Sequence, residues 1–130
     1  MDKFLVAFAT NDGKNFINNH FGDADFYYIF EIGACSIKYL KFIENNSEEE
    51  SGVHADPKKA KGVSKILLRE KVNVVCSKVF GPNIKRIKKQ FVCVLSQDKT
   101  IEAASQKLAK NFQKILVEWD KGAARKYLSI

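Results

Sequence analysis

The stretch His20–Glu31, HFGDADFYYIFE, carries the signal that decides the fold of this chain. It begins with a histidine and a glycine in a small polar loop and continues directly into an aromatic run. Phe26–Ile32 is rich in aromatic and β-branched residues, which is typical of a β-strand. Gly22 can adopt a positive φ and lets other groups approach the backbone closely. A histidine in such a loop can bind a metal or exchange a proton near neutral pH, although an ordinary loop histidine is the commoner case.

Two further apolar runs lie on either side of this strand. Lys3–Thr10 is apolar at nearly every position, which predicts a central strand buried on both faces. Cys35–Ile43 follows a tight connection and predicts a third strand. Lys38 and Lys41 interrupt this third run, so we expect it at an edge of the sheet.

The second half of the chain alternates helices and strands after the polar segment Glu44–Asp56, which contains the acidic run Glu48–Glu50. Asp56-Pro57 has the form of a helix start, and Thr100 can cap a later helix. The expected elements are a helix from Pro57 to Glu70, a strand over Val72–Cys76, a helix opening at Gly81-Pro82, a strand over Phe91–Leu95, a helix from Thr100 to about Asp120 and a short tail over Ala123–Ile130.

This order of elements, β-β-β-α-β-α-β-α, predicts a single α/β domain. Its simplest arrangement is a five-stranded mixed sheet of order 3-2-1-4-5, with strand 2 antiparallel to the others and helices on both faces. Ligands of such sheets bind at the carboxyl ends of the strands where the chain switches direction, here strands 1 and 4. The loops that leave these strands are Asn11–Gly22 and Ser77–Gly81, so His20 lies where the topology predicts a site.

Composition limits the classes of function. The chain has 130 residues, 45% of them hydrophobic and 28% charged, which suits one globular domain. No apolar run approaches the ~20 residues of a membrane span, and no cleavable leader is evident, so we expect a cytoplasmic protein. Three cysteines without Cys-x-x-Cys spacing exclude a disulfide framework and a metal site made of cysteine alone. The formal net charge of +7 favours an anionic partner: nucleic acid, an acidic protein or an anionic cofactor.

Several short segments, taken together, match the pattern of one known family. They are KFLVAFAT at Lys3–Thr10, Asp12-Gly13, His20-Phe21-Gly22 with Ala24, the aromatic run Phe26–Phe30, Val74-Val75-Cys76 followed by Gly81-Pro82-Asn83, and TIEAA at Thr100–Ala104. Over about residues 3–110 the chain resembles the dinitrogenase iron–molybdenum cofactor biosynthesis domain of nitrogenase accessory factors. The resemblance implies a ribonuclease-H-like α/β fold. We expect the domain over residues 1–110, and residues 111–130, which are not part of the family pattern, as a C-terminal helical extension packed on it.

The resemblance also implies a function. Proteins of this family bind or carry iron–molybdenum cofactor or its iron–sulfur precursors, and the histidine implicated in cluster binding falls on His20. The expected cofactor-binding residues are His20, Phe21, Gly22, Asn11, Lys78 and Gly81. The chain departs from the pattern at Ser77-Lys78, where family members often have two glycines. The Lys78 side chain can narrow the site or supply a cation to an anionic cluster.

The expected metal ligands are His20, Cys76 and His54, because iron–sulfur clusters take thiolate or imidazole ligands. Cys76 ends the fourth strand and can point into the site, although a buried core cysteine is at least as common. His54 follows the acidic segment, and an exposed loop histidine is the commoner reading there. Cys35 and Cys93 lie in strand-like runs, and we expect both in the core.

One histidine and at most one cysteine make an incomplete ligand set. Such a set suits a transient, non-catalytic carrier that exchanges cargo with cluster donor and acceptor proteins, rather than a closed structural metal site. It also suits a protein that binds no metal. No phosphate-binding glycine loop occurs, and no motif places a histidine beside Ser77 or Ser96, so we predict no catalytic activity.

Two alternatives of other classes remain at this point. Lysines and arginines at residues 58–61 and 85–89 can contact phosphates, which would suit a nucleic-acid-binding module. No recognised nucleic-acid motif accompanies them, and the first strand lacks the carboxylate that a nuclease of this fold needs, so we expect no specific nucleic-acid partner. The second alternative is a regulatory module that binds a small ligand. We expect no membrane partner, and the oligomeric state stays open.

Overall fold

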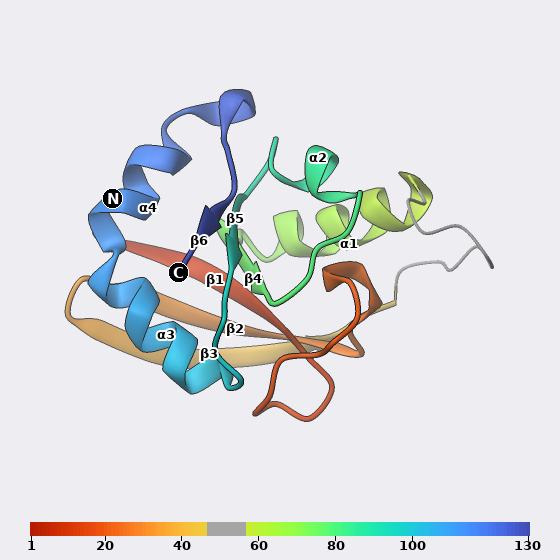
Figure 1. Ribbon diagram of the computed structural model, residues 1–130, viewed down its shortest axis with the longest axis horizontal. Helices are drawn as coiled ribbons and strands as arrows, with labels where there is room; N and C mark the ends of the chain where they lie inside the picture. Colours follow the sequence, from red (N-terminus) through yellow and green to blue (C-terminus); the bar gives the residue numbers. More distant parts are fainter. Residues whose placement is uncertain (47–56) are drawn as a thin grey trace.

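The protein is a mixed β-sheet with helices on both faces (Figure 1). The computed structural model describes the backbone of residues 1–46 and 57–130 and the side chains of residues 1–46 and 62–130. In chain order the elements are β1 (Lys3–Thr10), η1 (a 3-10 helix, Phe21–Asp23), β2 (Phe26–Gly33), β3 (Ser36–Glu44), α1 (Pro57–Arg69), β4 (Val74–Ser77), α2 (Ile84–Ile87), β5 (Val92–Leu95), α3 (Ile101–Lys110), α4 (Phe112–Trp119), η2 (Gly122–Ala124) and β6 (Leu128–Ser129).

The strand order is β3-β2-β1-β4-β5-β6. β1 pairs antiparallel with β2 along its whole length and parallel with β4, and β3 forms the far edge. The predicted order of five strands, the antiparallel second strand and the edge position of the third are therefore confirmed. The number of strands was wrong: the C-terminal tail adds β6, which pairs parallel with β5. The ribonuclease-H-like classification stays an expectation from the family resemblance.

The two faces of the sheet bury separate hydrophobic clusters. On the side that we call the α3 face, β1 presents Phe4, Val6 and Phe8 to α3 and α4. On the side that we call the η1 face, β1 presents Ala7 and Ala9 to a cluster that includes residues of η1, α1 and the segment after β4. The nearly continuous apolar run of β1 thus serves both faces, as a strand buried on two sides requires.

Several boundaries differ from the predictions. The long helix expected up to Asp120 is broken at Asn111 into α3 and α4. The second helix was expected to open at Gly81, but α2 begins at Ile84. Cys35 was expected in the core, yet it is exposed in the turn between β2 and β3. Thr100 caps α3 as predicted, since its side-chain oxygen accepts a hydrogen bond from the backbone N–H of Ala103.

The hairpin of β2 and β3 contains a bulge. The register shifts in its middle, and Leu40 has no partner on β2. The extra residue places Tyr39 and Phe42 on the same face of the sheet although they are three positions apart. The ring centroid of Tyr39 lies 5.4 Å from that of Phe30. The ring centroid of Phe42 lies 5.4 Å from that of Tyr28.

The buried side chain of Arg125 holds the C-terminal tail that leads to β6 in place. Arg125 donates hydrogen bonds to the carbonyl oxygens of Trp119 (3.1 Å) and Lys89 (3.0 Å). Its guanidinium also lies over the Trp119 ring, 4.3 Å from the centroid. Among the described residues, no helix has the length and apolarity needed to cross a bilayer.

Candidate functional site at the ends of β1 and β4

The loops that follow β1 and β4 meet at His20 and Gly81. His20 is half-buried and precedes η1 in extended backbone, with φ −63° and ψ 151°. Its imidazole ring lies against the backbone of Gly81, where a Cβ atom would come within 2.5 Å of His20 Nδ1. Gly81 also has a left-handed φ of +71°, which disfavours other residues. Only glycine at position 81 therefore allows this contact.

Phe21 and Phe80, which are neighbours of His20 and Gly81 in the sequence, make a second contact between the two loops. The ring of Phe21 stacks on that of Phe80, with centroids 5.1 Å apart and an interplanar angle of 22°. Phe21 also packs on Tyr27, at 4.9 Å between centroids. The side chain of Phe21 has no exposed surface. The Phe21 ring is enclosed by the core and anchors the loop that carries His20, and its contact with a cofactor stays a prediction.

Polar contacts fix the backbone around η1. The buried Tyr27 hydroxyl donates a 2.8 Å hydrogen bond to the carbonyl oxygen of Phe21, and burial raises the pKa of this hydroxyl. Asn45 Nδ2 donates to the carbonyl oxygens of Gly22 and Ala24, both at 2.8 Å. Gly22 does not use a positive φ, so its role differs from the predicted one. Its described contribution is this backbone carbonyl.

The start of the first loop is held by Asn11 and Asp12. Asn11 Oδ1 accepts a 2.8 Å hydrogen bond from the backbone N–H of Asp25, which joins the two ends of the His20 loop. The Asp12 carboxylate accepts hydrogen bonds from the backbone N–H groups of Asn15 and Lys14 and from the Asn15 side chain. These bonds hold the pKa of Asp12 well below its usual range. Both residues thus organise the loop through local hydrogen bonds.

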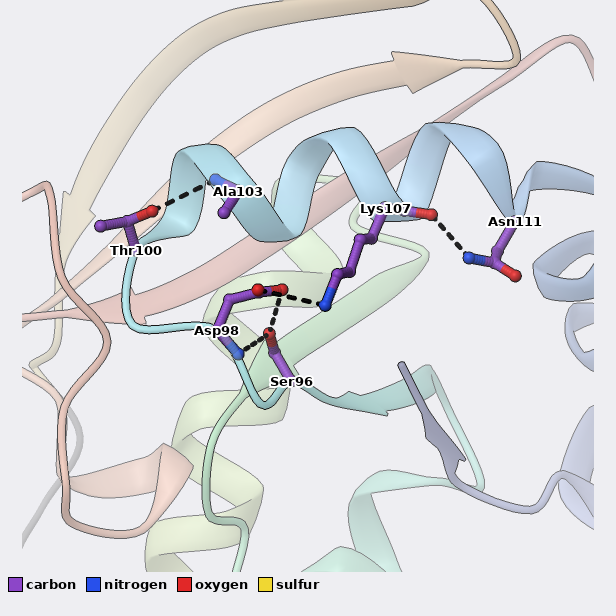
Figure 2. A network of polar contacts seen from close by, with 6 residues as sticks. All are labelled: Ser96, Asp98, Thr100, Ala103, Lys107 and Asn111. Carbon is purple, nitrogen blue, oxygen red and sulfur yellow. Dashed lines mark hydrogen bonds and ion pairs between the residues drawn. The ribbon is translucent and has the colours of Figure 1, made fainter.

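A network of polar contacts follows β5, at the same end of the strands as His20 and Gly81 (Figure 2). The Ser96 hydroxyl donates to Asp98 Oδ2 and accepts from the Asp98 backbone N–H. Asp98 Oδ1 forms an ion pair with Lys107 Nζ of α3 at 3.1 Å. The backbone N–H of Phe16 donates to the carbonyl oxygen of Lys99 at 3.0 Å. The loop after β1 is thereby joined to the segment that starts α3.

β4 ends with Ser77, and Lys78 follows it. The Ser77 hydroxyl is fully buried and has no hydrogen-bond partner within the described part of the chain. Lys78 is half-buried, and no ion pair joins it to another described residue. The segment between Ser77 and Gly81 therefore carries a lysine that has no carboxylate partner in the described ranges. Sequence reasoning noted Ser77 only as a departure from the family pattern and did not single out its hydroxyl.

Cys76 does not join this site, in contrast to the prediction. Its side chain belongs to the core of the α3 face, whereas Phe21 and Phe80 lie on the η1 face. Cys76 has no exposed surface, and burial, together with the negative charge of Asp98, raises the pKa of its thiol. A buried neutral thiol is a poor metal ligand because the thiolate is the form that binds.

The remaining predicted ligands are placed as follows. Cys93 is buried, as expected, and burial raises the pKa of its thiol to about 12. His54 and the acidic run Glu48–Glu50 lie outside the described residues. Within residues 1–46 and 57–130, no group of three or more histidine, cysteine, aspartate or glutamate side chains could hold a metal ion. Among the residues that the structure describes, His20 is therefore the histidine that lies at the site.

The comparisons with known proteins agree with this fold. The family model described as dinitrogenase iron–molybdenum cofactor matches residues 2–111. The crystal structure of a candidate dinitrogenase from Methanocaldococcus jannaschii is 21% identical, with a TM-score of 0.62 over 85% of this chain and 92% of that chain. An NMR structure from the same source gives a TM-score of 0.54 at 21% identity, over 88% and 90% of the two chains. At this identity the likeness shows the fold alone.

A search of curated protein sequences finds no significant match. The family match spans β1 to the end of α3, and so includes both loops of the site. The chain therefore belongs to the dinitrogenase iron–molybdenum cofactor family.

Proposed function

We propose that this protein is a non-catalytic carrier that binds an anionic iron–sulfur or iron–molybdenum cluster as transient cargo. His20 is the principal ligand or contact, at the ends of β1 and β4. The observation that carries the proposal is the seating of the His20 imidazole on Gly81, which positions a metal-binding group between two loops at the switch point of the sheet.

The order of the surrounding loop supports this role. The Phe21–Phe80 stack and the hydrogen bonds from Tyr27 and Asn45 fix the backbone on which His20 is carried. A preorganised ligand loses less conformational freedom on binding, so these contacts strengthen the binding that one imidazole can provide. Lys78 and the net charge of +7 favour an anionic cargo.

The small ligand set supports transient binding. With Cys76 in the opposite core, His20 alone cannot complete the coordination of a cluster. Cargo held by few protein ligands can pass to another protein, so we propose donor and acceptor proteins as partners. We place this exchange in the cytoplasm.

Anaerobic purification followed by iron, molybdenum and sulfide analysis tests the proposal. After reconstitution with ferrous iron and sulfide, His20→Ala should retain at least tenfold less cluster, which corresponds to about 1.4 kcal/mol of binding. The stability of the apo protein should change by about 1 kcal/mol or less, because a half-buried loop side chain contributes little. His54→Ala, at the other histidine among the expected ligands, should lose less cluster than His20→Ala.

Two outcomes would contradict the proposal. An unstable His20→Ala that still holds cluster would make His20 a structural residue. Tight, site-selective binding of DNA or RNA would favour the nucleic-acid alternative, which rests on the exposed cations of α2 and its flank, Lys85, Arg86 and Lys89. We expect only weak binding that falls steeply as salt rises.

A further inference from the structure

The Ser77 hydroxyl is a buried polar group without a hydrogen bond. Ser77 has no exposed surface, and within the described residues its Oγ has no partner. A hydroxyl that leaves water without a replacement bond destabilises the folded state. Nearly all buried polar groups in native proteins have a partner, so this exception needs an explanation.

Ser96, which directly follows the neighbouring strand β5, shows what a hydrogen-bonded serine looks like at the same end of the strands. The two residues are joined directly, since the Ser96 backbone N–H donates to the Ser77 carbonyl oxygen at 3.0 Å. Ser96 is also buried, but its hydroxyl makes two hydrogen bonds with Asp98 (Figure 2). The lack of a partner is therefore specific to Ser77 and is not shared by its neighbour.

The position of Ser77 relates it to the proposed site. Side chains alternate along β4: Val75 lies on the η1 face and Cys76 on the α3 face, which places Ser77 on the η1 face. Phe21 and Phe80 cover this face. Ser77 is the last residue of the strand whose following segment reaches Gly81 and the His20 ring. Its hydroxyl therefore lies at the strand end from which the proposed site is built.

We propose that the Ser77 hydroxyl donates a hydrogen bond to an anionic ligand at this site, either a sulfide or an oxygen atom of the bound species. The inference rests on the proposed function and adds a specific donor to it. Because Ser77 has no exposed surface, the proposal requires a local shift of residues 78 and 79, which precede the Phe80 and Gly81 contacts that hold His20. The hydroxyl lowers the stability of the apo protein because it has no partner there. It raises the affinity for the ligand because it gains a hydrogen bond on binding.

The test compares Ser77→Ala with Ser96→Ala. In the apo protein, Ser77→Ala should leave the Tm unchanged or raise it, because an unsatisfied group is removed. Its affinity for tetrathiomolybdate, measured by anaerobic titration calorimetry, should fall about tenfold, as expected for a hydrogen bond to a charged group. Ser96→Ala should lower the Tm, and its affinity should fall less than that of Ser77→Ala. Ser77→Thr, which keeps a hydroxyl, should bind more tightly than Ser77→Ala.

The same titration with molybdate distinguishes a ligand that presents sulfide from one that presents oxygen atoms. Ser77-dependent binding of molybdate alone would support the hydroxyl donor and contradict the sulfide cargo. A lower apo Tm for Ser77→Ala would show that the hydroxyl has a structural partner and would overturn the inference. Unchanged affinity in Ser77→Ala, with His20-dependent binding intact, would overturn the inference and leave the proposed function standing. A wild-type protein that binds neither anion nor cluster would overturn both.

Discussion

The two faces of the sheet are built from one strand but in different ways. On the α3 face, β1 contributes the large side chains of Phe4 and Phe8, and helices cover them. On the η1 face it contributes Ala7 and Ala9, and the cluster there draws on loop residues such as Ile17 and Phe80 as well as on helices. Small side chains on a strand let other groups approach the sheet closely. On the α3 face most of the packing against the sheet therefore comes from helices. The η1 face brings several loop residues close to the strand ends.

This difference suggests that stability and binding are separable. The α3 face contacts the loop that carries His20 through Phe16, four residues before the histidine. The η1 face includes Phe21, directly after His20, which stacks on Phe80 and whose carbonyl oxygen accepts a hydrogen bond from Tyr27. Substitutions on the α3 face should thus act mainly on the free energy of unfolding. Substitutions around η1 should act more on ligand affinity than on stability.

The largest expected effect is that of Phe4→Ala on the α3 face. Phe4 is 2% exposed and stacks on Phe112, with ring centroids 5.1 Å apart. Its truncation should lower the free energy of unfolding by about 3–5 kcal/mol, measured by urea unfolding. Phe4→Leu, which keeps most of the volume, should lose less. Because Phe4 lies at the end of β1 away from the site, the folded variant should bind cluster as the wild type does. A large loss of affinity at full folding would contradict the separation of the two faces.

Asn45→Ala should have a smaller effect on stability and a larger one on binding. The amide of Asn45 donates to two backbone carbonyls around η1, and its loss should lower the free energy of unfolding by about 1–2 kcal/mol. The His20 loop would then be less ordered, so cluster affinity should also fall. Asn46→Ala, at the exposed neighbour, is the matched control and should change neither quantity. Wild-type affinity in Asn45→Ala would show that loop order does not matter for binding.

The smallest expected effect is the pH response of the loop around Asp12. Its pKa is lowered in the folded protein, so the stabilisation from the ionised carboxylate is present above the unfolded pKa of about 3.9 and is lost as pH falls through the folded value. The NMR signals of the Lys14 and Asn15 amides should stay constant from pH 7 to about pH 4 and shift only in stronger acid. Asp12→Asn should remove this shift. A midpoint at or above the ordinary aspartate pKa would contradict the assigned hydrogen bonds.

The strand order could be predicted because its signals are local. The uniform apolarity of Lys3–Thr10 and the two lysines of β3 indicate a centre and an edge without knowledge of contacts. β6 could not be predicted, since two residues carry no periodicity and their place depends on Arg125, which reaches back to Lys89 and Trp119. The break at Asn111 was hidden because the apolar residues of α3 and α4 pack on the same core and keep one helical period.

The site was predicted in part. Topology and the His-Phe-Gly pattern placed His20 at the ends of β1 and β4, and the structure brings it against Gly81, which was also on the expected list. Cys76 was misjudged because an entirely apolar strand does not reveal which residue faces which side. Asn45 and the Ser77 hydroxyl were missed because a hydrogen bond across the fold, or the lack of one, leaves no pattern in the sequence.

The bulge at Leu40 has a consequence for how this chain can change in length over evolution. Elsewhere in the hairpin, losing one residue would turn every following side chain to the opposite face of the sheet. Loss of Leu40 would leave all other pairs of β2 and β3 in register, because this residue has no partner to lose. Tyr39 and Phe42 would keep their neighbours on β2. This position is therefore where we expect a one-residue gap when β3 is aligned with relatives that lack the bulge.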